Sequence, residues 1–397
     1  MITIKTFFDS LSFSKKLLIV IAALSTYFLF SELVLSLVNV KLTDNEYEDF
    51  IAGSFTEEEW KEIREIQHEL NRRGTRVQKI EGTVLYLYKE MHSKLFNINS
   101  DGFRGKEITP KKDDELRILI AGSSIMFGIC FPDGKSIPDL IQKKARKKID
   151  KKLLLYNVSV EGFVLQRNIA FAKRIYQKIK PDRILFYFGG NDIGGVFINK
   201  PLVIQKFNKS DKLDIDLFEK EALRTQNKWA FLKNIALVNQ ILTAVRNRIH
   251  QVGTIAEKTG NTQQKKELPK EMKIKAQTMV NYLVQQMIET DEFYKKQGIP
   301  VDFLFVSNIA LKKHPTFEES KALQQFETIF PYFSSYSRYV SRYISQQTDK
   351  ENISFINLSN TFDSTDKKTF FDIVHLSPHG QELMADRITE ILLKDLE

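Results

Sequence analysis

Residues 117–128, RILIAGSSIMFG, decide how the rest of the chain is interpreted. The run of isoleucine and leucine predicts a buried strand, and Gly-Ser-Ser ends that run abruptly. Ser124 then lies just beyond the carboxyl end of the strand, where open α/β sheets bind their ligands. Such a turn can expose a serine hydroxyl for nucleophilic attack, although an ordinary serine that caps the next helix fits the same fragment.

Downstream of this stretch, apolar strand patterns alternate with helical patterns. Strands are predicted at 116–121, 153–158, 183–188, 301–307 and 353–357, and helices at 136–149, 166–179, 270–297, 318–346 and 378–394. This alternation is typical of a parallel sheet with helices on both faces. We therefore expect an α/β protein, a flavodoxin-like three-layer α/β/α sandwich with a parallel sheet of about five strands.

Composition narrows the class of protein. The 397 residues, of which 42% are hydrophobic, can form one large domain or two ordinary ones. Cys130 is the single cysteine, so an internal disulfide framework is excluded. The strongest basic cluster, residues 142–152, contains no aromatic side chain on which a base could stack. We therefore expect no nucleic-acid partner, and interpret the cluster first as a solvated helix end and second as a site of attraction to anionic lipid or polysaccharide.

The amino-terminal region carries a membrane signal. Residues 17–40 are nearly all apolar, and as a helix they would span about 36 Å, enough for a hydrocarbon core of about 30 Å. Lys15 and Lys16 precede the run, which keeps the short tail cytoplasmic and exports the rest. No small-residue cleavage site closes the run, which favours a signal anchor over a cleaved signal peptide. Glu32 implies either a place near the far interface or a protein partner in the membrane.

These patterns divide the chain into four parts. We expect a cytoplasmic tail (1–16), a transmembrane signal anchor (17–40), a membrane-proximal helical segment (41–115) and the main domain (116–397). The expected location is the inner (cytoplasmic) membrane, with a single pass and the main domain on the periplasmic or extracellular side. Within that domain, residues 196–269 are too long for a simple crossover. They form an insertion that is either a structural excursion or a lid beside the ligand site.

Four short segments, placed after predicted strands or before the last helix, contain groups that could carry out catalysis. They are Gly122-Ser123-Ser124, Glu161-Gly162, Gly189-Gly190-Asn191-Asp192 and Asp372-Ile373-Val374-His375. A serine hydroxyl needs a base, which His375 can supply, and Asp372 can hold the other imidazole nitrogen. A tetrahedral oxyanion needs fixed donors, for which Gly162 and Asn191 are suitable.

Together, the four segments resemble the sequence blocks of the SGNH (GDSL-type) hydrolases, which are serine esterases on a flavodoxin-like sandwich. The resemblance covers roughly residues 97–195 and 300–394. It implies that Ser124 is the nucleophile, His375 the base and Asp372 its orienting carboxylate.

The same resemblance implies an oxyanion hole made by the Ser124 and Gly162 N–H groups and the Asn191 amide. It implies neither a metal nor an organic cofactor. One position departs from the family pattern: Ser123 stands where the family has aspartate, which removes a negative charge and leaves every proposed catalytic group in place.

The leading hypothesis is a membrane-anchored serine esterase that cleaves an ester-linked acyl group from an exported carbohydrate or lipid. An O-acyltransferase acting on an exported glycan would use the same site, and a non-catalytic glycan-binding or complex-assembly protein is the third hypothesis. A metal site at Asp372, His375 and His379 is the alternative chemistry for the last segment. Pro378 interrupts the helical spacing of the two histidines, so no metal is expected.

Overall fold

The computed structural model describes residues 56–72, 75–80, 83–146, 148–198, 267–306 and 308–394. The expected tail (1–16) and anchor (17–40) lie outside these residues, and so does nearly all of the expected insertion (196–269). Among the residues that the structure describes, no helix is long and apolar enough to cross a membrane.

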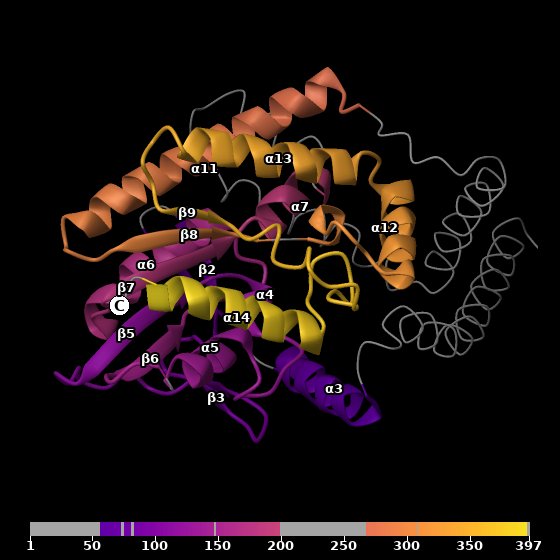
Figure 1. Ribbon diagram of the computed structural model, residues 1–397. Coiled ribbons are helices and arrows are strands. Elements are labelled where there is room, and N and C mark those ends of the chain that lie inside the picture. Colours follow the sequence, from indigo (N-terminus) through magenta and orange to yellow (C-terminus); the bar gives the residue numbers. More distant parts are fainter. Residues whose placement is uncertain are drawn as a thin grey trace, which may run out of the picture. The chain divides into compact units, whose positions relative to one another are not determined.

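A five-stranded parallel sheet forms the centre of the described structure (Figure 1). Its strands are β5 (Glu115–Ala121), β6 (Lys152–Asn157), β7 (Arg183–Phe188), β8 (Val301–Phe305) and β9 (Phe355–Asn357). The strand order is β6-β5-β7-β8-β9, and each pair of neighbours is parallel. The predicted α/β fold with a parallel five-stranded sheet is therefore confirmed. β5 lies at the switch point, where the chain changes its direction across the sheet.

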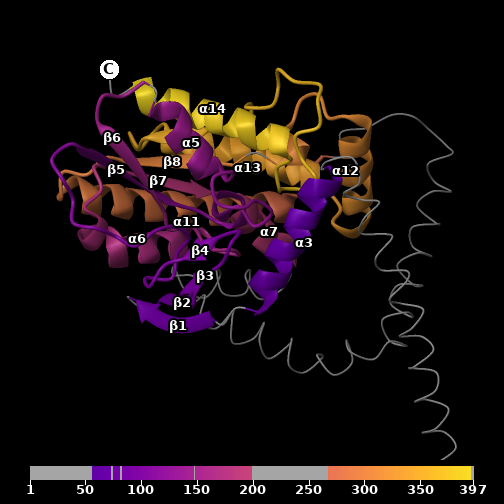
Figure 2. The ribbon, with the colours of Figure 1, turned by 90° about the horizontal axis from the view of Figure 1, so that it is seen from below.

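Helices cover both faces of the sheet, which is why its strands are almost continuously apolar. Figure 2 shows α5 (Ile137–Ala145) and α14 (Pro378–Lys394) on one face, and α6 (Leu165–Ile179) and α11 (Lys270–Lys295) on the other. Alternate residues of β5 supply both cores because successive side chains of a strand point to opposite faces. Leu119 packs with the α6 and α11 core, whereas Ile118 and Ile120 pack with the α5 and α14 core.

The expected single helix at 318–346 is wrong. The structure has two helices there, α12 (Phe317–Ile329) and α13 (Phe333–Thr348). Pro331 separates them, and Tyr332 takes a left-handed conformation with φ of 71°. A proline lacks the N–H that a continuous helix needs and disfavours helical backbone at the residue before it, which accounts for the break.

Residues 56–115 are less helical than expected. The helix α3 (Glu57–Arg72) begins at a capping box formed by Thr56 and Glu59. It is followed by two antiparallel pairs, β1 (Thr75–Ile80) with β2 (Thr83–Tyr88) and β3 (Met91–His92) with β4 (Asn97–Ile98). The expectation that 41–115 is a helical segment thus fails over these four strands, where β-branched and aromatic residues such as those of TVLYLY favour extended structure. Residues 56–115 also belong to the same compact unit as the sheet.

Candidate active site

The turn after β5 places Ser124 at the first position of a four-residue helix, α4 (Ser124–Phe127). Its N–H is one of the amides that no carbonyl of the helix can satisfy, so it can donate to a ligand. The side chain is largely buried, with 8% of the residue exposed. Gly122 is required by space: a Cβ there would lie 2.9 Å from Cβ of Met126.

The structure brings the predicted serine, histidine and aspartate together. His375 Nε2 lies 2.9 Å from Ser124 Oγ, and His375 Nδ1 lies 2.6 Å from Asp372 Oδ2. The other carboxylate oxygen of Asp372 accepts the N–H groups of Val374 and His375, at 2.8 and 2.6 Å. The aspartate therefore fixes both the tight turn and the ring that follows it. A serine, an imidazole and a carboxylate connected in this way can activate a hydroxyl group.

The electrostatics of this site favour the charged forms of both His375 and Asp372. Burial alone would lower the pKa of His375, but the hydrogen bond that its ring donates to Asp372 and the negative charges of Asp372 and Glu161 outweigh it, and the pKa is raised above the usual 6.5. Burial alone would raise the pKa of Asp372, yet the hydrogen bond and charge of His375 hold that pKa below 3.8. Asp372 is thus ionised at neutral pH and can stabilise an imidazolium.

The two further residues predicted for the oxyanion hole lie on two segments that a hydrogen bond connects. Asn191 Nδ2 donates to the backbone oxygen of Phe163 at 2.9 Å, which ties the start of α7 (Gly190–Ile198) to the residue after Gly162. Within the described part of the chain the second N–H of that amide has no acceptor, so it can donate to a ligand. Gly162 has φ of 76°, a conformation that suits glycine. No acceptor for its N–H occurs among the described residues.

Asp192, the neighbour of Asn191, has a positioning role that sequence reasoning did not assign. Its carboxylate accepts the N–H of Leu165 at 3.1 Å and the N–H of Gly189 at 2.9 Å. It thereby joins the amino end of α6 to the turn after β7. Burial raises the pKa of this carboxyl group, although the backbone donors oppose the shift.

A second feature that sequence reasoning missed is a buried ion pair behind the loop that carries His375. Lys312 Nζ and Glu319 Oε2 are 2.8 Å apart, and both side chains have no exposed surface. The other oxygen of Glu319 accepts the N–H groups of Thr369 and Phe370, at 2.8 and 3.0 Å. Lys312 Nζ also donates to the backbone oxygen of Lys367 at 2.7 Å. Only the capping-box spacing of Thr316 and Glu319 was visible in the sequence.

Arg104 supports the end of α4 and the residues that follow it, a role that was also not predicted from the sequence. It is 4% exposed, and its guanidinium donates to the backbone oxygens of Phe127, Gly128 and Phe131 at 2.7 to 2.8 Å. Asn157 Nδ2 donates to the oxygen of Met126 at 2.8 Å. The short helix α4 therefore has its last carbonyl groups satisfied by side chains from distant segments.

The remaining expectations concern Ser123 and the metal alternative. Ser123 occupies the N-cap of α4 and is 8% exposed, but its side chain makes no capping hydrogen bond. His379 Nε2 lies 3.5 Å from Thr365 Oγ1 rather than beside the Asp372–His375 pair. Among the described residues, no group of three or more His, Cys, Asp or Glu side chains could hold a metal ion.

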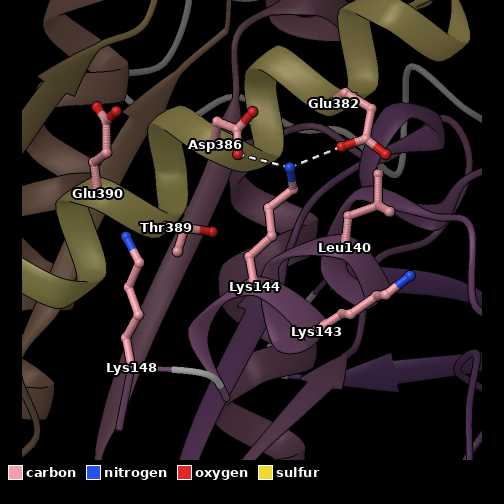
Figure 3. Close-up of a pocket in the computed structure, with 8 residues that line it drawn as sticks. All are labelled: Leu140, Lys143, Lys144, Lys148, Glu382, Asp386, Thr389 and Glu390. Atoms are coloured by element: carbon pink, nitrogen blue, oxygen red, sulfur yellow. Dashed lines mark ion pairs between the residues drawn. The ribbon is translucent and has the colours of Figure 1, made fainter.

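A hollow between α5 and α14 contains part of the basic cluster (Figure 3). Lys144 lies between Glu382 and Asp386, at 2.8 and 2.6 Å, so this lysine is neutralised locally. Lys152 lies 3.2 Å from Glu115. These two members of the cluster therefore contribute to the packing of the domain, and the hollow contains none of the predicted site residues.

Replacing Glu319 tests the role of the buried ion pair. In Glu319→Gln the Lys312 ammonium would stay buried without a counter-charge, which typically costs about 3–5 kcal/mol. We expect a loss of that size in the free energy of unfolding, measured in urea at pH 7. The matched control is Glu390→Gln, which breaks the exposed pair with Arg387 and should cost less than about 1 kcal/mol. Equal, small losses in both variants would contradict the role given to Glu319.

Comparison with known proteins agrees with this geometry. The family model for GDSL-like lipases/acylhydrolases matches residues 118–388. None of the curated proteins matches the chain.

Three solved structures illustrate the likeness, each with a TM-score of 0.37. The acetyl xylan esterase AlAXEase is 14% identical, over 70% of this chain and 99% of its own. A putative acylhydrolase from Bacteroides fragilis is 12% identical, over 73% and 93%. The psychrotrophic esterase EstA from Pseudoalteromonas is 12% identical, over 70% and 98%. At these scores the assignment depends on the family model, which spans well over half of the chain. The chain belongs to the GDSL-like lipase/acylhydrolase (SGNH) family and is an esterase or acylhydrolase of that type.

Proposed function

We propose that the protein is a serine esterase that removes an acyl group from an ester of an exported carbohydrate or lipid, using Ser124, His375 and Asp372. The observation that supports this most strongly is the unbroken hydrogen-bonded series from Ser124 Oγ through the imidazole to Asp372. The oxyanion donors would be the N–H groups of Ser124 and Gly162 and the amide of Asn191. That the ester belongs to a carbohydrate is part of this proposal, and one of the similar structures is an acetyl xylan esterase.

The proposed reaction has two half-reactions. In the first, His375 Nε2 takes the hydroxyl proton while Ser124 Oγ bonds to the ester carbonyl carbon, and the carbonyl oxygen becomes an oxyanion held by the three donors. The carbon–oxygen bond to the alcohol then breaks, and the alcohol leaves with the proton from His375. In the second, His375 takes a proton from water, whose oxygen bonds to the acyl carbon. The bond to Ser124 breaks, Oγ regains a proton, and the acid leaves.

Covalent labelling tests the nucleophile. A fluorophosphonate reacts with a serine hydroxyl only when a neighbouring base activates it. We expect stoichiometric labelling of the wild-type protein and of Ser123→Ala, and none of Ser124→Ala. The two variants are matched because both serines are adjacent and equally buried, with 8% exposed. Labelling that persists in folded Ser124→Ala would contradict the proposal.

The pH dependence tests the base. His375 must be neutral to accept a proton, and its pKa is raised above 6.5, so kcat/KM should fall about tenfold per pH unit once the pH drops below that raised pKa. Asp372→Asn removes the hydrogen-bonding charge that raises the pKa. We expect the inflection to move to lower pH and kcat to fall by up to about 10⁴-fold.

Glu161→Gln is the control for this profile, since Glu161 raises the pKa of His375 by charge alone. This variant should shift the inflection downward less than Asp372→Asn does and should keep most of kcat. An inflection that is unchanged in Asp372→Asn would show that His375 is not the titrating base.

We also propose that residues 17–40 anchor the chain in the inner membrane and that the catalytic domain lies outside the cytoplasm. The apolar run and the preceding Lys15 and Lys16 support this, and Glu32 would lie near the far interface or against a membrane partner. The full chain should remain in membranes after an alkaline carbonate wash, and alkaline phosphatase fused after Glu397 should be active. Release by carbonate or an inactive fusion would contradict the anchor or its orientation, respectively.

A further inference from the structure

Ser124 and His375 line a small pocket that the reaction scheme above does not use. The pocket has a volume of about 10 Å³, which is close to the least space that one water molecule needs. Apart from Ser124, His375 and Gln381, its lining is apolar or small. The other lining residues are Ile125, Gly128, Ile129, Cys130, Phe131, Phe371 and Leu376.

The outer wall of this pocket is a packed cluster that we call the acyl wall. It consists of Ile63, Cys130, Phe131 and Phe371, none more than 9% exposed. Ile63 comes from α3 and packs in this cluster with three residues that line the pocket, so a helix that precedes the sheet in the chain supports the lining. The Phe371 ring stacks on the His375 ring at 5.7 Å between centroids. The wall therefore joins α3, the loop after α4 and the loop that carries the histidine.

The acyl wall is held in place and cannot easily be pushed outward. Arg104 Nη2 donates to the backbone oxygen of Phe131 at 2.7 Å. The N–H of Phe371 donates to the backbone oxygen of His375 at 3.0 Å. Its neighbour Phe370 is bonded through its N–H to Glu319 at 3.0 Å. Widening the pocket would disturb these buried bonds, and a close-packed interior resists such changes.

The position of the pocket indicates which part of an ester it receives. At a tetrahedral carbon on Ser124 Oγ, the oxyanion must face its donors and the leaving oxygen must face His375 Nε2, which leaves the acyl carbon for the remaining direction. The pocket lining includes Ser124 and His375 but neither Gly162 nor Asn191, so it extends from Ser124 on a side that these two oxyanion donors do not line. A sugar or lipid alcohol is far too large for it, whereas a methyl group is similar in size to a water molecule.

We propose that this pocket binds the acyl group and restricts the enzyme to acetate esters. The reaction is then the transfer of an acetyl group from an alcohol oxygen to water, which releases the alcohol and acetate. This proposal rests on the proposed esterase function and adds to it the chemical class of the acyl group. Chains longer than acetyl would have to displace the acyl wall.

A series of p-nitrophenyl esters tests this directly, because the leaving group is constant and only the acyl chain changes. With the full-length protein, kcat/KM for the acetate should exceed that for the butyrate by at least about 100-fold, since a methylene group that a pocket cannot hold costs about 10- to 200-fold. The hexanoate should be slower still. Equal or higher kcat/KM for butyrate or hexanoate would overturn the proposal.

Two variants of the pocket sharpen the test. Phe131→Ala and Ile129→Ala both remove apolar bulk from the lining without touching the proposed catalytic groups, and each should raise the butyrate-to-acetate ratio of kcat/KM at least about tenfold. The control is Phe171→Ala, which removes a fully buried ring on α6 outside the pocket and should leave the ratio unchanged. An unchanged ratio in the folded pocket variants would overturn the claim that the acyl wall limits the length of the acyl chain.

Failure of this inference and failure of the esterase proposal would give different experimental results. If Ser124 is labelled by a fluorophosphonate and all three esters are hydrolysed at similar rates, only the acetate restriction is wrong. If Ser124 is not labelled and no ester is hydrolysed, the proposed function itself is wrong, and the acetate restriction fails with it.

Discussion

The site depends on one hydrogen bond, between Ser124 Oγ and His375 Nε2, and the surrounding structure holds these two groups in position. This bond joins residues 251 positions apart at 2.9 Å, so each must be held to a fraction of an ångström by its own element. A parallel sheet makes this juxtaposition available, because the turn after a strand and the loops that return from other strands meet at one edge. Gly122 and Gly380 allow the required close packing: a Cβ on Gly380 would lie 2.1 Å from the backbone oxygen of Thr369.

Buried polar groups supply the remaining precision. Glu319 and Lys312 hold the loop before His375, Arg104 holds the end of α4, and Asp192 holds the turn beside Asn191. Burying such charges costs several kcal/mol each before pairing, so they add little net stability compared with apolar side chains. Their effect is geometric, because each accepts or donates several hydrogen bonds from backbone that has no regular partner. The site is therefore positioned by charges from segments that contribute no reacting atom.

Much of the fold and of the site could be predicted from the sequence, because the signals for these parts come from residues that are close together in the chain. Strand patterns at the sheet and the residues of the four loops depend on neighbours within a few positions, and the observed strands β5 to β9 begin and end close to the predicted ranges. Pro331 also carried a local signal for a helix break, which the prediction of one helix over 318–346 passed over. The TVLYLY strand likewise contains β-branched and aromatic residues that favour extended structure, a signal that the expectation of a helical segment ignored.

What could not be predicted depends on contacts between distant segments. Nothing near Arg104 in the sequence indicates that it binds carbonyl groups more than twenty positions away. Glu319 could be recognised as part of a capping box, but its pairing with the loop around Thr369 is tertiary. The same holds for Ile63, whose packing against Cys130, Phe131 and Phe371 depends on the position of α3. The anchor and the insertion lie outside the described residues, so those expectations stand as predictions.

The central claim is that Ser124 and His375 act as one unit, and a double-mutant cycle on kcat/KM tests it most directly. Residues that act as a unit have strongly non-additive effects. Ser124→Ala, His375→Ala and the double variant should therefore lose nearly the same activity toward an acetate ester, with the double variant no worse than the poorer single one. A double variant whose loss equals the product of the two single losses would show that the residues act independently and would contradict the account.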